Sequence, residues 1–337
     1  MPLLRNYPYF LALFGLTLAC QSPEEPSVEP EENRFEWTDP SFAVAYPGPY
    51  TDVDSALIQL ASRAIASLSE GHPDNIPFSL SDSVKVSMVN WPISVLDPQE
   101  FQTFFTTWHG QYAGVRYEAF NVRAAYNEVY QTHVFLCFGR WQFQSESGDF
   151  EDRYSTILLS TDNSGSLTAV TEWAMCWPQN SPLIFQANAD PSHFHYFCDS
   201  KIGSMEAAVR AVSNAQALFA QDTHLLKTYL ADSVQFTSSC GLNTMWSREQ
   251  LASSVQSNAP FIGVDPISVI PFYQERQENH VVLVLDYESF IEDGRLKRYS
   301  YLRMFILDRQ LKIINILIQR RLVPNAVNWD WQDARKS

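Results

Sequence analysis

The sequence predicts an α+β protein of two tandem domains, in each of which helices come first and a mostly antiparallel sheet follows. Two observations carry this prediction. The order of helical and strand patterns is the same in both halves. Three segments also recur in the same order at nearly constant spacing: residues 80–86 match 230–236, residues 133–138 match 280–285, and residues 153–155 match 298–300. For a chain of 337 residues, two domains are the natural expectation.

In the first half, apolar residues at helical spacing over 53–68 predict a helix that Gly71 and Pro73 end. The segment Thr51-Asp-Val-Asp54 just before it has the form of a capping box. Alternation over residues 84–88 predicts a half-buried strand. The remaining expected elements are a short helix over 98–107 and four strands over 117–125, 130–143, 153–160 and 167–173.

The second half repeats this order. An amphipathic pattern over 205–219 predicts a helix, followed by short helices over 225–230 and 248–257. A first strand is expected over 234–237. The long strands then follow over 267–272, 280–290, 298–307 and 312–319.

The first twenty residues have the pattern of a targeting segment. Arg5 is the only charged residue before Cys20, and residues 10–18 form an apolar run that is too short to span a bilayer. The segment Leu16-Thr-Leu-Ala-Cys20 resembles a bacterial lipobox, although Thr17 replaces the usual aliphatic residue. Cleavage before Cys20 and its lipidation are expected; an ordinary signal peptide and an uncleaved anchor are the alternatives.

The next segment is rich in proline and glutamate, so it predicts an extended tether that holds a globular body away from a membrane. Gln21 gives no inner-membrane retention signal of the aspartate type, which favours an outer-membrane lipoprotein facing the periplasm or the cell surface. The expected boundaries are a signal peptide over 1–19, a tether over 20–48, domains over 49–177 and 204–323, a linker over 178–203 and a tail over 324–337.

Composition limits the classes of partner. The chain has 23 basic and 38 acidic residues, a net charge of −15, which disfavours nucleic acid and anionic membrane surfaces. Membrane contact is therefore expected through the lipid anchor only. Hydrophobic residues make up 45% and aromatic residues 14% of the chain, as in folded domains.

Four cysteines follow Cys20, an even number that permits disulfides in an oxidising compartment. Cys176 and Cys198 flank the interdomain region, which they could staple together, and are the favoured pair. Cys137 lies in an apolar strand pattern typical of a buried free thiol, and Cys240 is expected to be structural. None of the cysteines has metal-ligand spacing, so no metal and no cofactor are predicted.

Each half resembles the nuclear transport factor 2-like superfamily, which includes SnoaL-like cyclases and ketosteroid isomerases. The resemblance rests on Tyr-Leu-Ala-Asp-Ser-Val-Gln-Phe at 229–236 after a helix pair, on Trp-Ser-Arg-Glu at 246–249, and on the long terminal strands. It covers roughly 120 residues in each half. It implies cone-like domains, in which a curved, mostly antiparallel sheet packs on N-terminal helices and usually encloses an apolar pocket.

Isomerases of this superfamily use a carboxylate base on the first strand and a second acid on a late strand. The resemblance places these positions at Ser238 and Arg303 in the second half. In the first half they fall at Met88 and Ile157, or at Leu158 if the register shifts by one. None is a carboxylate, whereas proton abstraction beside a carbonyl needs a group with a pKa near the working pH. The sequence therefore favours a protein that is not an isomerase or cyclase, and no catalytic residue is assigned.

Histidines give two further candidates. His133 and His280 begin equivalent strands; they could act as bases, but residues that satisfy a strand edge are the favoured interpretation. His193 and His195 form an H-x-H pair in the expected linker, without the carboxylate-rich cluster that a metal site needs.

The candidate ligand-binding residues are Arg303, Tyr299, Tyr301, Ser238, Trp91 and Trp108. Tyr299, Tyr301 and Arg303 alternate onto one strand face, where the arginine would suit an anionic ligand. The favoured alternative is an ion pair with Asp286 or Glu288 on an outer face. Trp91 and Trp108, with Trp141 and Trp173, could line an aromatic pocket, although plain core packing is more common.

The sequence thus predicts a lipid-anchored envelope protein that acts as a non-catalytic binding module. Its ligand would be a small apolar or anionic molecule, or an envelope protein partner. A scaffold subunit of an envelope assembly and an isomerase- or hydrolase-like enzyme with an unrecognised site are the alternatives. An open interior with one or two polar groups would favour a ligand, and a filled interior would favour a scaffold.

Overall fold

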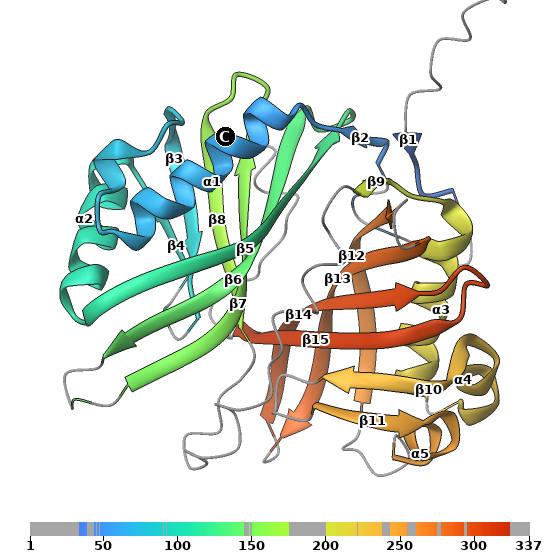
Figure 1. Ribbon diagram of the computed structural model, residues 1–337. Helices are drawn as coiled ribbons and strands as arrows, with labels where there is room; N and C mark the ends of the chain where they lie inside the picture. Colours follow the sequence, from blue (N-terminus) through green and yellow to red (C-terminus); the bar gives the residue numbers. More distant parts are fainter. Residues whose placement is uncertain are drawn as a thin grey trace, which may run out of the picture. The chain divides into compact units, whose positions relative to one another are not determined.

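The computed structural model describes residues 34–38, 44, 46, 48–89, 91, 93–144, 148, 150–174, 200–220, 222–237, 243–254, 261–274, 278–292 and 295–323 (Figure 1). The expected signal peptide, Cys20, most of the tether, the greater part of the linker and the tail lie outside these residues. The described chain is a mixed α+β structure with a mostly antiparallel sheet, in agreement with the predicted fold class.

The described residues before 175 form two α-helices, a short 3-10 helix and eight strands. The helices are α1 (Ser55–Ser69), η1 (Pro73–Asn75) and α2 (Pro98–Gly110). The strands are β1 (Arg34–Phe35), β2 (Tyr50–Asp52), β3 (Leu80–Ser87), β4 (Ser94–Leu96), β5 (Ala113–Asn127), β6 (Thr132–Gln144), β7 (Phe150–Thr161) and β8 (Leu167–Ala174).

Residues after 199 repeat much of this order. The helices are α3 (Met205–Ala220), α4 (Thr223–Tyr229) and α5 (Arg248–Ser254). The strands are β9 (Ser200–Ile202), β10 (Leu230–Thr237), β11 (Asn243–Ser247), β12 (Phe261–Gln274), β13 (Asn279–Glu292), β14 (Arg295–Leu307) and β15 (Ile313–Val323). The α-helices and long strands expected from the sequence are therefore confirmed in the described residues, although some ends differ. The largest difference is in β12, which was expected over 267–272 and begins at Phe261.

The predicted capping box at residues 51–54 is wrong. Thr51 lies in β2 and pairs with Tyr126 of β5, so its backbone is extended and its place is in the sheet. The N-cap of α1 is Asp54, whose carboxylate accepts a hydrogen bond from the Ala56 N–H at 2.7 Å. A complete capping box begins α2 instead, where Asp97 and Glu100 each accept a hydrogen bond from the other's backbone N–H.

The sheet has two similar parts. One runs β1-β2-β5-β6-β7-β8, and the other runs β15-β14-β13-β12-β9. In each part a short strand joins the last long strand in parallel, β3 on β8 and β10 on β15, and carries a further antiparallel strand, β4 or β11. In the described residues the two parts meet at the pair Arg320–Ala174.

One hydrophobic core lies between α1, α2 and one face of the first part of the sheet. Its large members are Ile65, Phe101, Phe105, Trp108, Phe135, Trp141, Ile157 and Leu159, each at most 2% exposed. The period of 2 along β6 explains which residues face this core: Phe135, Cys137 and Trp141 point to it, whereas Leu136 and Phe138 belong to the other core.

The second core joins the opposite face of the first part to the second half of the chain. It contains Leu136, Phe138, Leu158 and Trp173 together with buried residues of α3 and β12–β15. Polar contacts also join the two halves here: the Trp173 indole N–H donates to the Ser300 hydroxyl at 3.0 Å, and the Tyr50 and Ser268 hydroxyls lie 2.7 Å apart. Burial raises the pKa of Tyr50 to about 12. The sheet face that carries no helices in the first half is therefore covered by the second half.

Candidate functional site

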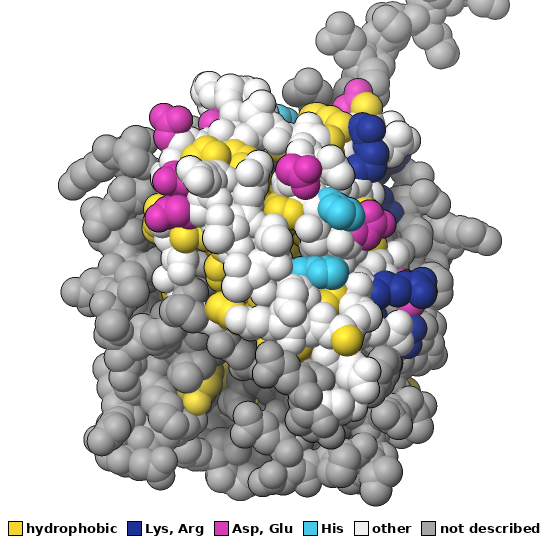
Figure 2. Space-filling model, turned by 90° about the vertical axis from the view of Figure 1, so that its left-hand side faces the viewer, with side chains coloured by type: hydrophobic (Ala, Val, Ile, Leu, Met, Phe, Trp, Pro, Cys, Tyr) yellow, Lys and Arg dark blue, Asp and Glu magenta, His cyan; other side chains and the backbone are white. Residues whose placement is uncertain are grey.

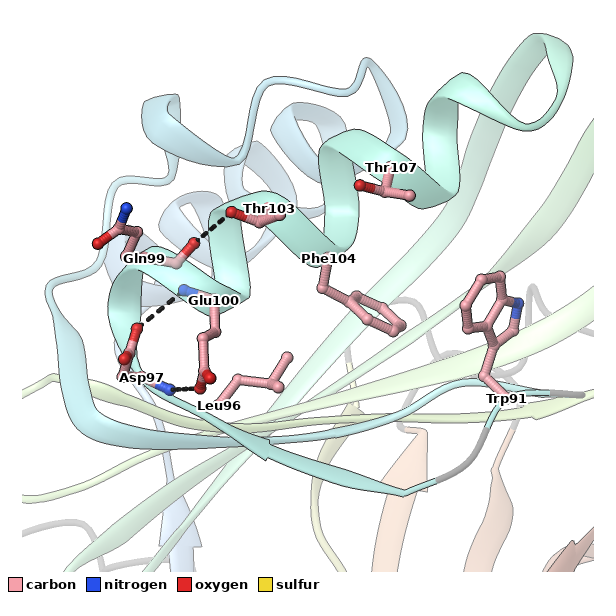
Figure 3. A pocket seen from close by; sticks show the side chains of 8 residues that line it. All are labelled: Trp91, Leu96, Asp97, Gln99, Glu100, Thr103, Phe104 and Thr107. Carbon is pink, nitrogen blue, oxygen red and sulfur yellow. Dashed lines mark hydrogen bonds between the residues drawn. The ribbon is translucent and has the colours of Figure 1, made fainter.

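A surface pocket of about 390 Å³ lies between α2 and the segment that leads into and through β4 (Figure 3). It is at the lower end of the size range of small-molecule sites. Eight residues line it: Trp91, Leu96, Asp97, Gln99, Glu100, Thr103, Phe104 and Thr107.

Two half-buried aromatic rings form the apolar part of the pocket. Trp91 and Phe104 meet edge to face, with ring centroids 5.4 Å apart and planes at 77°. The α2 residues Phe101, Phe105 and Trp108 point into the core, so Phe104 lies at the border of the buried face and is left beside the pocket. Figure 3 shows its ring extending from α2 toward the side on which Trp91 stands.

The rim of the pocket carries two carboxylates. Oδ1 of Asp97 accepts from the Glu100 N–H at 2.8 Å, and Oε2 of Glu100 accepts from the Asp97 N–H at 3.0 Å. The Thr103 hydroxyl donates to the Gln99 carbonyl at 2.9 Å. The capping box therefore holds the first turn of α2, and with it the pocket, in a defined geometry.

Figure 2 views the molecule from the side on which α2 lies. Acidic side chains are scattered among hydrophobic ones over much of the described surface, and the basic side chains gather toward one edge. The eight residues of the pocket include no lysine or arginine.

Of the two tryptophans predicted to bind a ligand, Trp91 lies in this pocket and Trp108 does not. Trp108 is 2% exposed and packs on Trp141, with ring centroids 5.0 Å apart. Tyr117 also packs on Trp141, and its hydroxyl donates to the carbonyl oxygens of Cys137 and Ser155. Aromatic side chains thus occupy the interior between α1, α2 and the sheet.

The positions that the family resemblance assigned to acids in the first half lie in this interior. Met88 and Ile157 are each 1% exposed. Ile157 pairs with Cys137, and Arg303 pairs with Val284 at the matching place of the second half. Ile157, and not Leu158, is therefore the structural counterpart of Arg303.

Sequence analysis missed one carboxylate in the same interior. Glu172 pairs with Ile157 across β7 and β8, is fully buried, and accepts a hydrogen bond from the Val89 N–H at 3.0 Å. The sequence did contain an indication, because Glu172 is a single glutamate within a mostly apolar strand. A charged side chain at a buried position normally has a hydrogen-bond partner. The contact fixes the chain where β3 ends.

Arg303 does not present a guanidinium to solvent. Its side chain is fully buried, donates to the Asp286 carboxylate through Nη1, and lies over the Tyr301 ring, with Cζ 4.6 Å from the ring centroid. Desolvation lowers the pKa of Arg303 well below its ordinary value. Of the two ion-pair partners that the sequence suggested, Asp286 and Glu288, the structure pairs Arg303 with Asp286. Both side chains are fully buried, so the expected place on an outer face is wrong.

The alternation of Tyr299, Tyr301 and Arg303 on one face of β14 is confirmed by their cross-strand pairing with Glu288, Asp286 and Val284. Both tyrosines are less than 10% exposed. Ser238, the remaining member of this predicted group, lies outside the described residues.

The two equivalent histidines have the same structural role. His133 packs on its cross-strand neighbour Tyr126, with ring centroids 4.7 Å apart, and His280 packs on Tyr273 at 4.9 Å. Desolvation lowers the pKa of both imidazoles; for His280 the Glu206 carboxylate opposes it. Both imidazoles thus pack, in a tilted geometry, on a tyrosine of the neighbouring strand.

Cys137 is a buried free thiol, as expected, and burial raises its pKa. The other cysteines and the histidine pair discussed in the sequence analysis lie outside the described residues; these are Cys176, Cys198, Cys240, His193 and His195. In the part of the chain that the structure describes, no three histidine, cysteine or acidic side chains gather as a metal site would require. None of the described helices has the length and apolar character needed to cross a membrane.

Comparisons with known proteins give structural neighbours alone. No family model matches the sequence. No curated protein matches it either. Solved structures that match cover about a third of the chain. An NTF2-like protein from Cytophaga hutchinsonii matches 33% of this chain and 91% of its own, at 19% identity and a TM-score of 0.26.

Two other matching structures were solved as a complex and with a bound carotenoid. The Mtr2–Mex67 M domain complex of C. albicans matches 37% of this chain and 98% of its own, at 13% identity and a TM-score of 0.30. The orange carotenoid protein of Anabaena, solved with canthaxanthin, matches 35% of this chain and 36% of its own, at 12% identity and a TM-score of 0.27.

Proposed function

We propose that this protein is a lipid-anchored, non-catalytic binding module of the bacterial envelope, and that a small ligand with an apolar part binds in the pocket between α2 and β4. The observation that carries the proposal is the Trp91–Phe104 pair, two half-buried rings that line an open pocket in an otherwise packed region. Rings of this kind provide most of the contact area in small-molecule sites.

The buried groups elsewhere support a binding role over catalysis. The Glu172 carboxylate is fully buried and holds the Val89 backbone, and the Arg303 guanidinium is engaged by Asp286. A general acid or base must reach a substrate through hydrogen-bond contact. Neither of these groups lines the pocket, so they suit a structural role.

The buried Arg303–Asp286 pair is also the reason why the ligand site is not proposed at Arg303. An anionic ligand there would have to displace Asp286 from a fully buried pair, and the arginine would then exchange one carboxylate for another. The pocket at Trp91 needs no such displacement.

A scaffold subunit is the second candidate. The filled interior between α1, α2 and the sheet favours it, since Trp108, Trp141 and Phe135 occupy the space that an enclosed ligand would need. A scaffold would contact its partner through the outer surface, and the pocket would then carry no ligand.

The wider assignment rests on the sequence. We propose two tandem NTF2-like domains over 49–177 and 204–323, joined by the linker 178–203. Cys20 would carry the lipid, residues 20–48 would be the tether, and the body would stand off the outer membrane. Repetition of the parallel pairs β3–β8 and β10–β15 in matching places supports the tandem arrangement.

Native mass spectrometry of the full-length protein in a non-ionic detergent tests the binding function. The wild type should retain a small non-covalent mass after gentle release from the micelle, and Trp91→Ala should lose it. A scaffold predicts bare protein in both samples and co-purifying envelope protein instead. The same spectra test the anchor: a diacylglycerol mass on the wild type should be absent from Cys20→Ser.

A further inference from the structure

We infer that the pocket between α2 and β4 is built for an organic cation, a substituted ammonium group that carries an alkyl or aryl body. This inference rests on the proposed function, because it names the chemical class of ligand for the same site. It follows from the type of ring contact, the charges of the rim, and the size of the pocket.

The ring geometry suits a cation. An edge-to-face pair leaves one aromatic face uncovered by its partner, and the face of a tryptophan or phenylalanine ring is the negative end of its quadrupole. Trp91 and Phe104 are both only half-buried, with Leu96 beside them. A cation within about 6 Å of such a ring is attracted to its face, and tryptophan is the strongest partner.

The rim supplies charge of the complementary sign. Asp97 and Glu100 each use one carboxylate oxygen for the capping box, and Oδ2 of Asp97 and Oε1 of Glu100 accept no hydrogen bond from the described residues. The remaining polar groups of the pocket, on Gln99, Thr103 and Thr107, are neutral. The two carboxylates outweigh the partial positive charge at the first turn of α2. An anionic ligand would therefore meet repulsion and no basic side chain.

The dimensions select a small molecule over a protein. A stable protein interface takes about 20–30 residues from each side. This pocket offers eight residues and about 390 Å³, enough for a ligand with a small number of heavy atoms. The net charge of −15 would also raise the local concentration of cationic ligands.

The test compares two probes of the same shape. Choline carries a trimethylammonium group, and 3,3-dimethylbutan-1-ol carries a neutral tert-butyl group in its place. Isothermal titration of the full-length protein in a non-ionic detergent should give choline at least about tenfold tighter binding than the neutral alcohol. Equal affinities would overturn the cationic class and leave the proposed function standing.

A charge-only variant sharpens the test. In Asp97→Asn/Glu100→Gln the side chains can still cap α2, because Asn is a good N-cap and Gln serves at the third position of a capping box. This variant should bind choline at least about tenfold more weakly. Asp54→Asn removes the same kind of charge from the N-cap of α1, outside the pocket, and should bind choline as the wild type does.

Choline binding that survives the double substitution, or that falls equally in Asp54→Asn, would contradict the inference. Absence of binding by either probe would also overturn it. Native mass spectrometry separates that result from failure of the binding function, since a retained mass that Trp91→Ala loses would keep the site and reject only its cationic ligand. Thermal unfolding of each variant confirms that the fold is intact.

Discussion

The rings of Trp91 and Phe104 meet edge to face at 5.4 Å, although one residue precedes β4 and the other lies in the middle of α2. The two rings line the pocket that lies between α2 and the segment leading into β4. A hydrogen bond from the Trp91 N–H to the Met88 carbonyl at 3.2 Å ties the tryptophan backbone to the end of β3. The chain that leaves β3 thus helps to position Trp91 at the pocket.

The two candidate tryptophans should separate binding from stability. Trp91→Ala removes a half-buried ring from a pocket and should cost about 1 kcal/mol of unfolding free energy while abolishing ligand retention. Trp108→Ala empties a fully packed place beside Trp141 and should cost about 3–5 kcal/mol. Urea unfolding measures both. Equal losses of stability would mean that Trp91 is also a core residue.

The buried ion pair makes a second prediction. Asp286→Asn leaves the Arg303 charge buried without its carboxylate and should destabilise the protein by about 3–5 kcal/mol. Replacing both residues, as Asp286→Leu/Arg303→Met, should restore most of that loss. Glu278→Gln breaks the exposed Glu278–Arg309 pair and serves as the matched control, at under about 1 kcal/mol. A loss in Asp286→Asn no greater than in the control would show that the pair is not desolvated.

Two glycines give a third test. A methyl group on Gly139 would lie 2.5 Å from both the Tyr117 ring and the Glu118 carbonyl oxygen, so Gly139→Ala should destabilise by about 1–3 kcal/mol. The same change at Gly110 meets nothing within 4 Å and should be neutral or slightly stabilising. Chemical denaturation distinguishes them. A neutral Gly139→Ala would contradict the close packing of Tyr117 on β6.

Histidine burial predicts a pH dependence. The pKa of His280 in the folded protein lies below its ordinary value near 6.5, because desolvation outweighs attraction by Glu206. The unfolded chain then binds more protons as the pH falls below about 6.5, so the stabilising contribution is complete above that pH and is lost on acidification. Urea unfolding between pH 7.5 and pH 5 should show a smaller loss in His280→Gln than in the wild type. Parallel curves would rule out this linkage.

Local sequence patterns determined most of the fold. The predicted strands over 153–160 and 167–173 correspond to β7 and β8 within a few residues, because both segments are rich in β-branched and aromatic residues and a turn segment separates them. The strands that sequence analysis missed are short. β4 has three residues and no visible period, and it exists through pairing with β3.

The capping error has a similar cause. Thr51-Asp-Val-Asp54 has the sequence pattern of a capping box. Thr51 nevertheless lies in β2, because it pairs with Tyr126 of β5. Asp54 is the first residue free to cap α1. A tertiary contact thus decided between two acceptable local solutions.

The candidate site could be predicted only in part for the same reason. Trp91 was identified as a possible ligand contact, but Phe104 and Leu96 join it only because β4 packs under α2. Alternation along β14 predicted that Arg303 shares a face with Tyr299 and Tyr301, and the neighbouring strand offered Asp286 and Glu288 as partners. It could not give the depth of burial, which depends on what covers that face.

The most direct test of the binding site is ¹⁹F NMR of protein that carries 5-fluorotryptophan at all nine tryptophan positions. Trp91→Phe and Trp108→Phe assign two resonances, one in the pocket and one in the core. On addition of the ligand recovered by native mass spectrometry, or of choline, the Trp91 resonance should shift in a saturable way while the Trp108 resonance stays in place. A saturable shift of other resonances with Trp91 unmoved would place the ligand elsewhere and contradict the account.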